Sequence, residues 1–233
     1  MNHAGLLVVP KPGITAHDQS PMKPLSIRIT VFASILCLGG CTAFVEEPAY
    51  KSVSEEGAFE VRDYPRVIVA ETTVDATLEE AGGEAFERLF GYISGDNVSD
   101  AEIAMTSPVT QTGASESISM TAPVGQTKRN GGWVVSFIMP ASYTLESLPK
   151  PTDPKVALRE VPSRRIAVIR YSGTWSAERY RDHLEKLESW MDKQRLEASG
   201  DPIWARYNPP FTPWFLRRNE IMIPVAGDSS GVE

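Results

Sequence analysis

Two stretches of the chain carry apolar residues at helical spacing. The first spans about residues 77–93, and Thr77 and Glu80 at its start have the spacing of a capping box. The second spans about residues 177–198 and is followed by Gly200, a residue type that often ends helices. Apolar positions recur every three or four residues, so each stretch predicts an amphipathic helix with one buried face. The buried positions are Leu78, Ala81, Ala85, Phe86, Leu89 and Ile93 in the first helix, and Tyr180, Leu184, Leu187 and Met191 in the second.

The segments around the two helices repeat in the same order. Residues 62–66 read Arg-Asp-Tyr-Pro-Arg and precede the β-branched run 67–70. Residues 159–163 read Arg-Glu-Val-Pro-Ser and precede a similar run at 165–170, an offset of 97 residues (from 62 to 159). A helix follows each run, and two strand-like pieces follow each helix. Each half therefore reads strand–helix–strand–strand, and the duplication predicts an α+β fold with a mostly antiparallel sheet or barrel and two helices outside it.

The beginning of the chain has the pattern of an export signal. Residues 22–28 carry two positive charges, residues 29–38 are apolar, and Leu-Gly-Gly leads into Cys41. The apolar run is too short to favour a membrane-spanning helix, although an uncleaved anchor is the alternative. The ending resembles the bacterial lipoprotein signal, in which cleavage precedes the cysteine and lipid is attached to it. We therefore expect a signal peptide at 22–40 and lipidation of Cys41.

The rest of the chain divides by composition. We expect residues 1–21 to be an over-extended gene start or a disordered segment, because they show no periodicity. Residues 41–49 read as a tether, and the small, polar residues 226–233 read as a frayed tail. The domain between them, residues 50–225, has halves at about 50–148 and 155–225. The proline-rich residues 148–154 form a stiff link between the halves.

Charge and cysteine content limit the classes of function. The chain has 30 acidic and 23 basic residues and no basic run, so we expect no nucleic-acid partner. Cys37 lies in the signal, which leaves Cys41 as the one cysteine of the mature chain. Without a cysteine pair the domain has no disulfide framework and must be held by its core.

One short phrase occurs twice in the first half. Residues 105–111 read Met-Thr-Ser-Pro-Val-Thr-Gln, and residues 120–126 read Met-Thr-Ala-Pro-Val-Gly-Gln. Each copy predicts an extended segment interrupted by proline. This phrase, the duplication, the Ser-Phe-Ile-Met-Pro run at 136–140 and the proline-rich link together resemble the SOUL family of haem-binding proteins. The resemblance covers nearly all of residues 50–225.

The resemblance implies both a fold and a ligand. The fold would be a distorted, mostly antiparallel eight-stranded barrel with two flanking helices, similar to domains related to the DNA-gyrase inhibitor. The ligand would be haem, a related tetrapyrrole or another flat apolar molecule, bound without chemistry near the first helix. No Cys-x-x-Cys-His motif is present, so haem would be held non-covalently.

Haem requires an apolar slot, cationic groups for its propionates and sometimes an axial ligand. His183 is the one histidine of the mature chain, and it is either an axial ligand or a partly exposed surface residue. The methionines of the doubled phrase either ligate iron or line the slot, or they fill gaps in the core. Six side chains are the candidate ligand contacts: Phe86, Arg88, Tyr92, Met105, Met120 and His183.

Three of these candidates lie on the first predicted helix. Arg88 could reach a propionate, or it could lie on a solvated face beside Glu84 and Glu87. Phe86 and Tyr92 are residue types that more often belong to the core. A dense aromatic group near the C-terminus either covers one mouth of the barrel or packs inside it: Trp204, Tyr207, Phe211, Trp214 and Phe215.

Two other functional classes stay open. Some relatives of the barrel are thought to hydrolyse small molecules with a glutamate in the pocket, and Glu102 or Glu220 would be that glutamate here. The second open class is a structural envelope lipoprotein whose cleft is vestigial. Thr42 follows the lipidation cysteine, whereas an aspartate there resembles the inner-membrane retention signal. The expected location is therefore the outer membrane, facing the periplasm.

Overall fold

The computed structural model describes residues 45–99, 115–129 and 131–227 of the chain. Within them the main sheet has nine strands in the order β1-β2-β9-β11-β10-β5-β6-β3-β8, and every neighbouring pair is antiparallel. A separate small sheet pairs β4 (Asn97–Val98) with β7 (Lys150–Pro151). The strands of the main sheet are β1 (Lys51–Glu56), β2 (Phe59–Tyr64), β3 (Val67–Val74), β5 (Val124–Arg129), β6 (Gly132–Ile138), β8 (Ala157–Val161), β9 (Arg164–Tyr171), β10 (Ile203–Arg206) and β11 (Asn219–Pro224).

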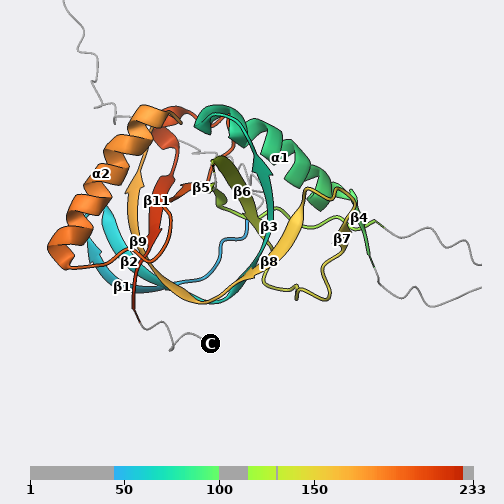
Figure 1. The fold of residues 1–233 in the computed structure, drawn as a ribbon, viewed down its shortest axis with the longest axis horizontal. Coiled ribbons are helices and arrows are strands. Elements are labelled where there is room, and N and C mark those ends of the chain that lie inside the picture. The colour runs from blue at the N-terminus through green and yellow to red at the C-terminus, as the bar shows by residue number, and fades with distance from the viewer. Residues whose placement is uncertain (1–44, 100–114, 130, 228–233) are drawn as a thin grey trace, which may run out of the picture. The chain divides into compact units, whose positions relative to one another are not determined.

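Two helices cover the outside of this curled sheet (Figure 1). Helix α1 (Leu78–Ser94) packs on β3 and β6, and helix α2 (Ala177–Gln194) packs on β9 and β11. The predicted α+β fold of duplicated units with two flanking helices is confirmed. The sheet has nine strands rather than eight because the residues before β2 form the additional edge strand β1. It is a distorted barrel and not a closed one, since β1 and β8 are its two edges.

The helix boundaries follow from local hydrogen bonds. The capping box at the start of α1 is confirmed, because Thr77 Oγ1 accepts from the Glu80 N–H and the Glu80 carboxylate accepts from the Thr77 N–H. Helix α2 ends earlier than predicted, at Gln194 rather than near residue 198. Arg195 takes the left-handed conformation, with φ at 58°, and its N–H donates to carbonyl groups of the last turn. A residue other than glycine therefore ends this helix, and the residue type alone does not predict a helix end at that position.

The two halves of the domain exchange strands. A turn at Pro65 joins β2 to β3, yet β2 pairs with β9 of the other half. A turn at Pro162 joins β8 to β9, yet β8 pairs with β3. Each proline lies in the repeated Arg-acid-apolar-Pro phrase, so the repeat marks the two places where the chain crosses from one half to the other. The edge strands β1 and β8 do not pair with each other, so the two halves of the sheet are joined by these crossings and by the pairing of β5 with β10.

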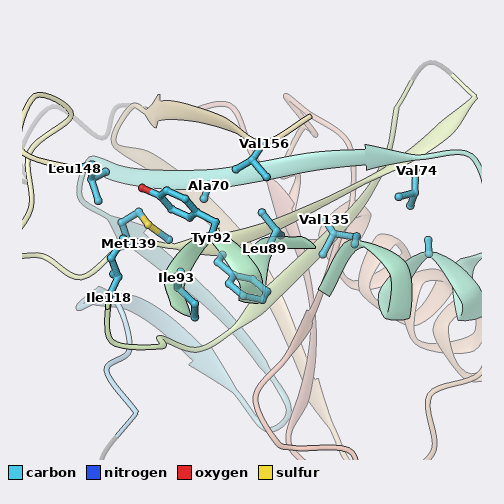
Figure 2. Close-up of a cluster of buried hydrophobic side chains, with 13 residues drawn as sticks. Ala70, Val74, Leu89, Tyr92, Ile93, Ile118, Val135, Met139, Leu148 and Val156 are labelled. Carbon is cyan, nitrogen blue, oxygen red and sulfur yellow. The ribbon is translucent and has the colours of Figure 1, made fainter. Parts of the chain in front are cut away.

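Three buried clusters form the core. One lies between α1 and the sheet and joins Leu89, Tyr92 and Ile93 of the helix with strand residues such as Val135 (Figure 2). A second lies under α2 and is built around Leu187, Trp190 and Met191 of that helix. The third lines the inner face of the sheet and consists of Tyr64, Ile166, Val168, Ala205 and Met222. Each helix therefore closes the outer face of its own half, while the inner face is shared by both.

One compact unit, residues 43–233, contains both sheets and both helices. All three core clusters consist of residues from this unit. We therefore expect a chain that begins at residue 43 to fold on its own. In the three described stretches, no helix is both long enough and apolar enough to cross a membrane.

The exchanged strands are tied by an ion pair whose strength can be measured. Arg165 of β9 donates to both carboxylate oxygens of Asp63 on β2, at 2.7 and 2.8 Å, and the Asp63 side chain is only 8% exposed. Replacing Asp63 by Asn should lower the free energy of unfolding by about 1–2 kcal/mol at neutral pH. The hydrogen bond from Arg165 holds the pKa of Asp63 below its ordinary value of 3.8. The pair therefore stabilises the fold above that pH, and its contribution disappears as the pH falls through the lower folded value.

Urea unfolding of residues 43–233 at several pH values measures this effect. Glu160 occupies the equivalent place in the repeat and supplies the control. Its 3.5 Å contact with Arg66 is exposed, so Glu160→Gln should change the free energy of unfolding by less than about 0.5 kcal/mol. Equal losses in the two variants, or a loss in Asp63→Asn that does not depend on pH, would contradict this account.

Candidate functional site

A cleft of about 670 Å³ lies between the β1–β2 hairpin and the segment that leads into β11. Aromatic residues and arginines make up much of its lining, which also includes Glu55 and Glu60, and we refer to it as the aromatic–arginine cleft. On the hairpin side it is bounded by Tyr50 and Phe59, and Tyr171 stands at the end of β9. The opposite wall is the run Phe215–Arg218. Its size lies within the range of pockets that hold cofactors and drug-sized molecules.

A rigid apolar lip borders the cleft. Phe211 is 85% exposed, and Trp214, Phe215 and Leu216 are each 59–64% exposed. The lip is held in place by hydrogen bonds. The Gly173 N–H donates to the Trp214 carbonyl at 3.0 Å, and Arg217 donates to two carbonyls of the preceding loop at 2.6 and 2.8 Å. Four large apolar side chains held together in water are typical of a surface that contacts a ligand, a partner or a lipid.

The arginines of the cleft differ in their partners. Arg62 and Arg218 form ion pairs with buried or nearby carboxylates. Arg217 instead stacks on Trp175, with its guanidinium carbon 4.3 Å from the ring centroid, and donates only to backbone carbonyls. The exposed Arg170 has no carboxylate partner within the described part of the chain. Two cations of the cleft, Arg170 and Arg217, are therefore available to an anionic ligand.

Behind the cleft lies a buried carboxylate whose hydrogen-bonding capacity is fully used. Glu220 on β11 is 0% exposed. It accepts from both terminal nitrogens of Arg62 at 2.8 and 3.2 Å, from Arg218 Nε at 3.0 Å and from the Tyr207 hydroxyl at 2.7 Å. Burial alone would raise the pKa of Glu220, but the hydrogen bond and charge of Arg62 outweigh it and hold this pKa below its ordinary value. The group is therefore an ionised structural anchor.

A second hollow opens at the proline turn between β2 and β3. Its outer groove, about 510 Å³, lies between residues 46–49 and the segment 138–146. It leads to an inner cavity of about 70 Å³ that shares Pro48, Pro65 and other lining residues with it. The inner cavity is lined almost entirely by apolar side chains, and Arg164 is the one charged residue on its wall.

The residues of α1 that the sequence predicts as ligand contacts do not line either hollow. Tyr92 is buried, and its hydroxyl donates to the Pro149 carbonyl at 2.9 Å. Phe86 packs edge-on against Phe137 of the core. The Arg88 side chain is 13% exposed and is held by Thr72, Glu84 and Asp153. A guanidinium with two carboxylate partners has less capacity left for a propionate.

The remaining predicted contacts are spread over the molecule. Met120 is partly buried against the α1 cluster, whereas Met105, Cys41 and Glu102 lie outside the described residues. His183 on α2 stacks on Tyr171 with ring centroids 3.9 Å apart. As neutral imidazole, its Nδ1 donates to the Arg179 carbonyl at 2.7 Å, and burial holds its pKa below the ordinary value. His183 is not among the residues that line the aromatic–arginine cleft.

The structure divides the C-terminal aromatic group that the sequence singled out. Trp204 is fully buried, while Phe211, Trp214 and Phe215 form the exposed lip. The cleft arginines were not anticipated, although the aromatic and proline-rich composition of residues 208–218 marks the segment that contains one of them. Among the described residues, no group of three or more histidines, cysteines or carboxylates could hold a metal ion.

Comparison with known families decides the class of the protein. The family model of the SOUL heme-binding protein matches residues 45–224, which include both sheets and both helices. The chain belongs to this family. Membership supports haem or a related tetrapyrrole as its non-covalent ligand, as the sequence predicted.

Individual relatives agree with this SOUL assignment. The chain is 28% identical to Heme-binding protein 1 of Xenopus tropicalis over 165 residues, which cover 70% of this chain and 82% of that protein. It is 27% identical to Heme-binding protein 1 of Xenopus laevis over 185 residues, or 79% and 92% of the two chains. Among solved structures, the cryo-EM structure of the EcmrR–DNA complex matches with a TM-score of 0.53 at 10% identity. That match covers 73% of this chain and 57% of the other, and it concerns the fold alone.

Proposed function

We propose that this SOUL protein is a lipid-anchored, non-catalytic carrier of haem or a related tetrapyrrole, and that the ligand lies in the aromatic–arginine cleft. Family membership supports the class of ligand. The observation that carries the placement is the exposed lip of Phe211, Trp214, Phe215 and Leu216. It lies beside two arginines for which the described residues provide no carboxylate partner. Of the surfaces described, this one combines exposed aromatic area with available cations.

The chemistry of the ligand matches these features. Haem is a flat, apolar ring system that carries two propionates on one edge. The ring would lie against the lip, where stacking on Trp214 and Phe215 removes apolar surface from water. Arg170 and Arg217 would pair with the propionates, because a guanidinium binds a carboxylate through two parallel hydrogen bonds. Bound haem would supply iron, and the chain's own residues would orient the ring and exclude water from one of its faces.

The proposed binding does not depend on the predicted histidine. His183 is not among the residues that line the cleft, and its ring stacks on Tyr171, which belongs to the buried cluster under α2. Stacking and charge pairing alone are therefore the interactions that we propose for the ligand.

The alternative of a hydrolase that uses a pocket glutamate has weaker support. A general base for hydrolysis near neutral pH needs a raised pKa and a free lone pair. Glu220 has a lowered pKa, and its oxygens accept four hydrogen bonds from Arg62, Arg218 and Tyr207. Its fixed role is to hold two arginines at the base of the cleft.

Lipid anchoring would bring the cleft near a membrane. Glu47 forms an ion pair with Arg218 of the cleft wall at 2.9 Å, so residue 47 is fixed beside the cleft. Cys41 precedes Glu47 by six residues, which span at most about 20 Å. We propose attachment to the outer membrane with the domain in the periplasm, where a carrier could exchange an apolar ligand with the lipid surface.

Hemin titration of residues 43–233, followed by the Soret absorbance, tests the placement of the ligand. Replacing Phe215 and Leu216 together by Ala should raise the hemin Kd about tenfold or more, because both side chains are exposed and would be covered by the ligand. Arg217→Met should have a similar effect through the lost propionate contact. Val98→Ala removes an apolar side chain that is 39% exposed on β4, and it should leave the Kd unchanged.

The same titration separates the competing sites. If Phe86→Ala on α1 weakened binding while the cleft variants did not, the ligand would lie near the first helix and the proposed placement would be wrong. If wild-type protein gave no saturable Soret change at micromolar concentration, the proposed function itself would fail.

The lipid anchor is tested in the full chain expressed in a bacterium with two membranes. Radiolabelled palmitate should be incorporated into the wild type and into Cys37→Ser, which changes the cysteine of the signal. It should be absent from Cys41→Ser, since the lipid would be attached to that cysteine. Label in Cys41→Ser, or none in the wild type, would exclude lipidation of Cys41 and would leave the haem proposal untouched.

A further inference from the structure

The inner cavity lies where the two halves of the domain exchange strands. It is lined from β2 and β3 on one side of the crossing and from β9 on the other. Its wall is apolar apart from Tyr64, Ser136 and Arg164. The cavity adjoins the outer groove, because both hollows share Pro48, Pro65, Val67 and Ile138. The two hollows together lead from the surface toward the middle of the curled sheet.

Arg164 breaks the internal repeat at this place. The offset of 97 residues makes Val67 its equivalent in the first half, and both residues line the cavity. Val67 faces Val161 across β3 and β8, whereas Arg164 faces Tyr64 across β9 and β2. The fold therefore accepts an aliphatic side chain at this position. The guanidinium is an addition that the architecture does not require.

Among the described residues, no carboxylate pairs with Arg164. It forms no ion pair or side-chain hydrogen bond in the described part of the chain, and the nearby cations Arg159 and Arg129 repel it. Burial and these two charges hold its pKa below the ordinary value, although an arginine stays protonated at neutral pH. A half-buried cation without a partner destabilises the fold. The three carboxylates that line the outer groove have other partners. Glu160 pairs with Arg66, Glu46 accepts from the Ala141 N–H, and Glu146 accepts from the Thr144 side chain.

We propose that this hollow is a second binding site, distinct from the aromatic–arginine cleft, and that it takes an amphiphilic carboxylic acid with an unbranched apolar chain. Arg164 would bind the carboxylate in the inner cavity, whose small volume suits a compact head group. The apolar chain would lie in the outer groove against Val67, Ile138 and Leu145. A bulky ring system does not fit the inner cavity, so the site differs from the haem cleft in both shape and charge.

Residues 46–49 form a fixed wall of the outer groove. Residue Glu46 forms a parallel bridge with Thr121, and the Ala122 N–H donates to the Glu46 carbonyl at 2.8 Å. The Glu46 carboxylate accepts from the Ala141 N–H at 2.9 Å. These hydrogen bonds hold the wall against which the apolar chain of a bound acid would lie.

The test uses residues 43–233 and the fluorescent probe 11-(dansylamino)undecanoic acid. The wild type should give a saturable rise in dansyl fluorescence, reversed by dodecanoate and much less by dodecanol, which lacks the charge. Arg164→Met keeps a similar volume and should weaken binding of the probe about 10- to 100-fold. Arg164→Lys should restore much of it. Arg181→Met removes an exposed arginine on α2 that lines neither hollow, and it should change little.

Each outcome decides the proposal. Unchanged probe affinity in Arg164→Met, equal displacement by dodecanol and dodecanoate, or no saturable probe signal in the wild type would overturn it. Hemin titration of Arg164→Met serves as the second readout and should match the wild type. If hemin binding were lost in Arg164→Met, the hollow would be part of the haem site and the inference of a separate acid site would be wrong. Failure of the cleft variants to affect hemin would leave the acid site intact.

Discussion

The exchange of strands between the two halves is the constraint on which the rest of the structure depends. Strand β2 ends just before Pro65 and pairs with β9 of the other half. Strand β8 ends just before Pro162 and pairs with β3 of the other half. Because the edges of the sheet do not meet, these crossings and the ion pairs across them keep it curled. Both hollows depend on this arrangement. The inner cavity lies at the crossing itself, and the aromatic–arginine cleft is walled by β2 and the end of β9.

A buried charge network connects the crossing to the cleft. Glu220 fixes Arg62 of β2 and Arg218 of the cleft wall from inside the sheet. Together with Glu60 and Glu47, the ionised Glu220 balances the charges of Arg62 and Arg218, while Arg170 and Arg217 have no carboxylate partner among the described residues. Glu220 at the base of the cleft therefore determines where two of the cleft's arginines lie. The same arrangement explains why a buried glutamate in this barrel need not be catalytic.

The repeating patterns in the sequence were sufficient to predict the fold. The capping box at Thr77, the apolar stripe of α1 and the repeat at 62–66 and 159–163 all correspond to observed elements. The end of α2 was missed because Arg195, rather than a glycine, takes the left-handed conformation. The exchange of strands was also missed, since a repeat shows that two units exist and not which strands they share.

The functional site was less accessible to sequence reasoning for a physical reason. Whether an arginine can bind a ligand depends on which carboxylates lie beside it after folding. Arg88 is a candidate propionate partner by sequence, but in the fold it pairs with Asp153, which lies far along the chain. Arg62 and Glu220 likewise meet only through the fold. Arg164 is the exception, because an alignment of the two repeats places a charge against Val67 and so marks it from sequence alone.

The most direct test of the central claim is where hemin binds. Two-dimensional ¹H–¹⁵N spectra of residues 43–233, recorded during addition of hemin, would locate the paramagnetic iron through broadening of nearby backbone signals. The account predicts broadening centred on the β1–β2 turn at 57–60, the end of β9 at 170–172 and the lip at 214–218. Broadening centred on α1 near Phe86, or on the outer groove at 138–146, would contradict it.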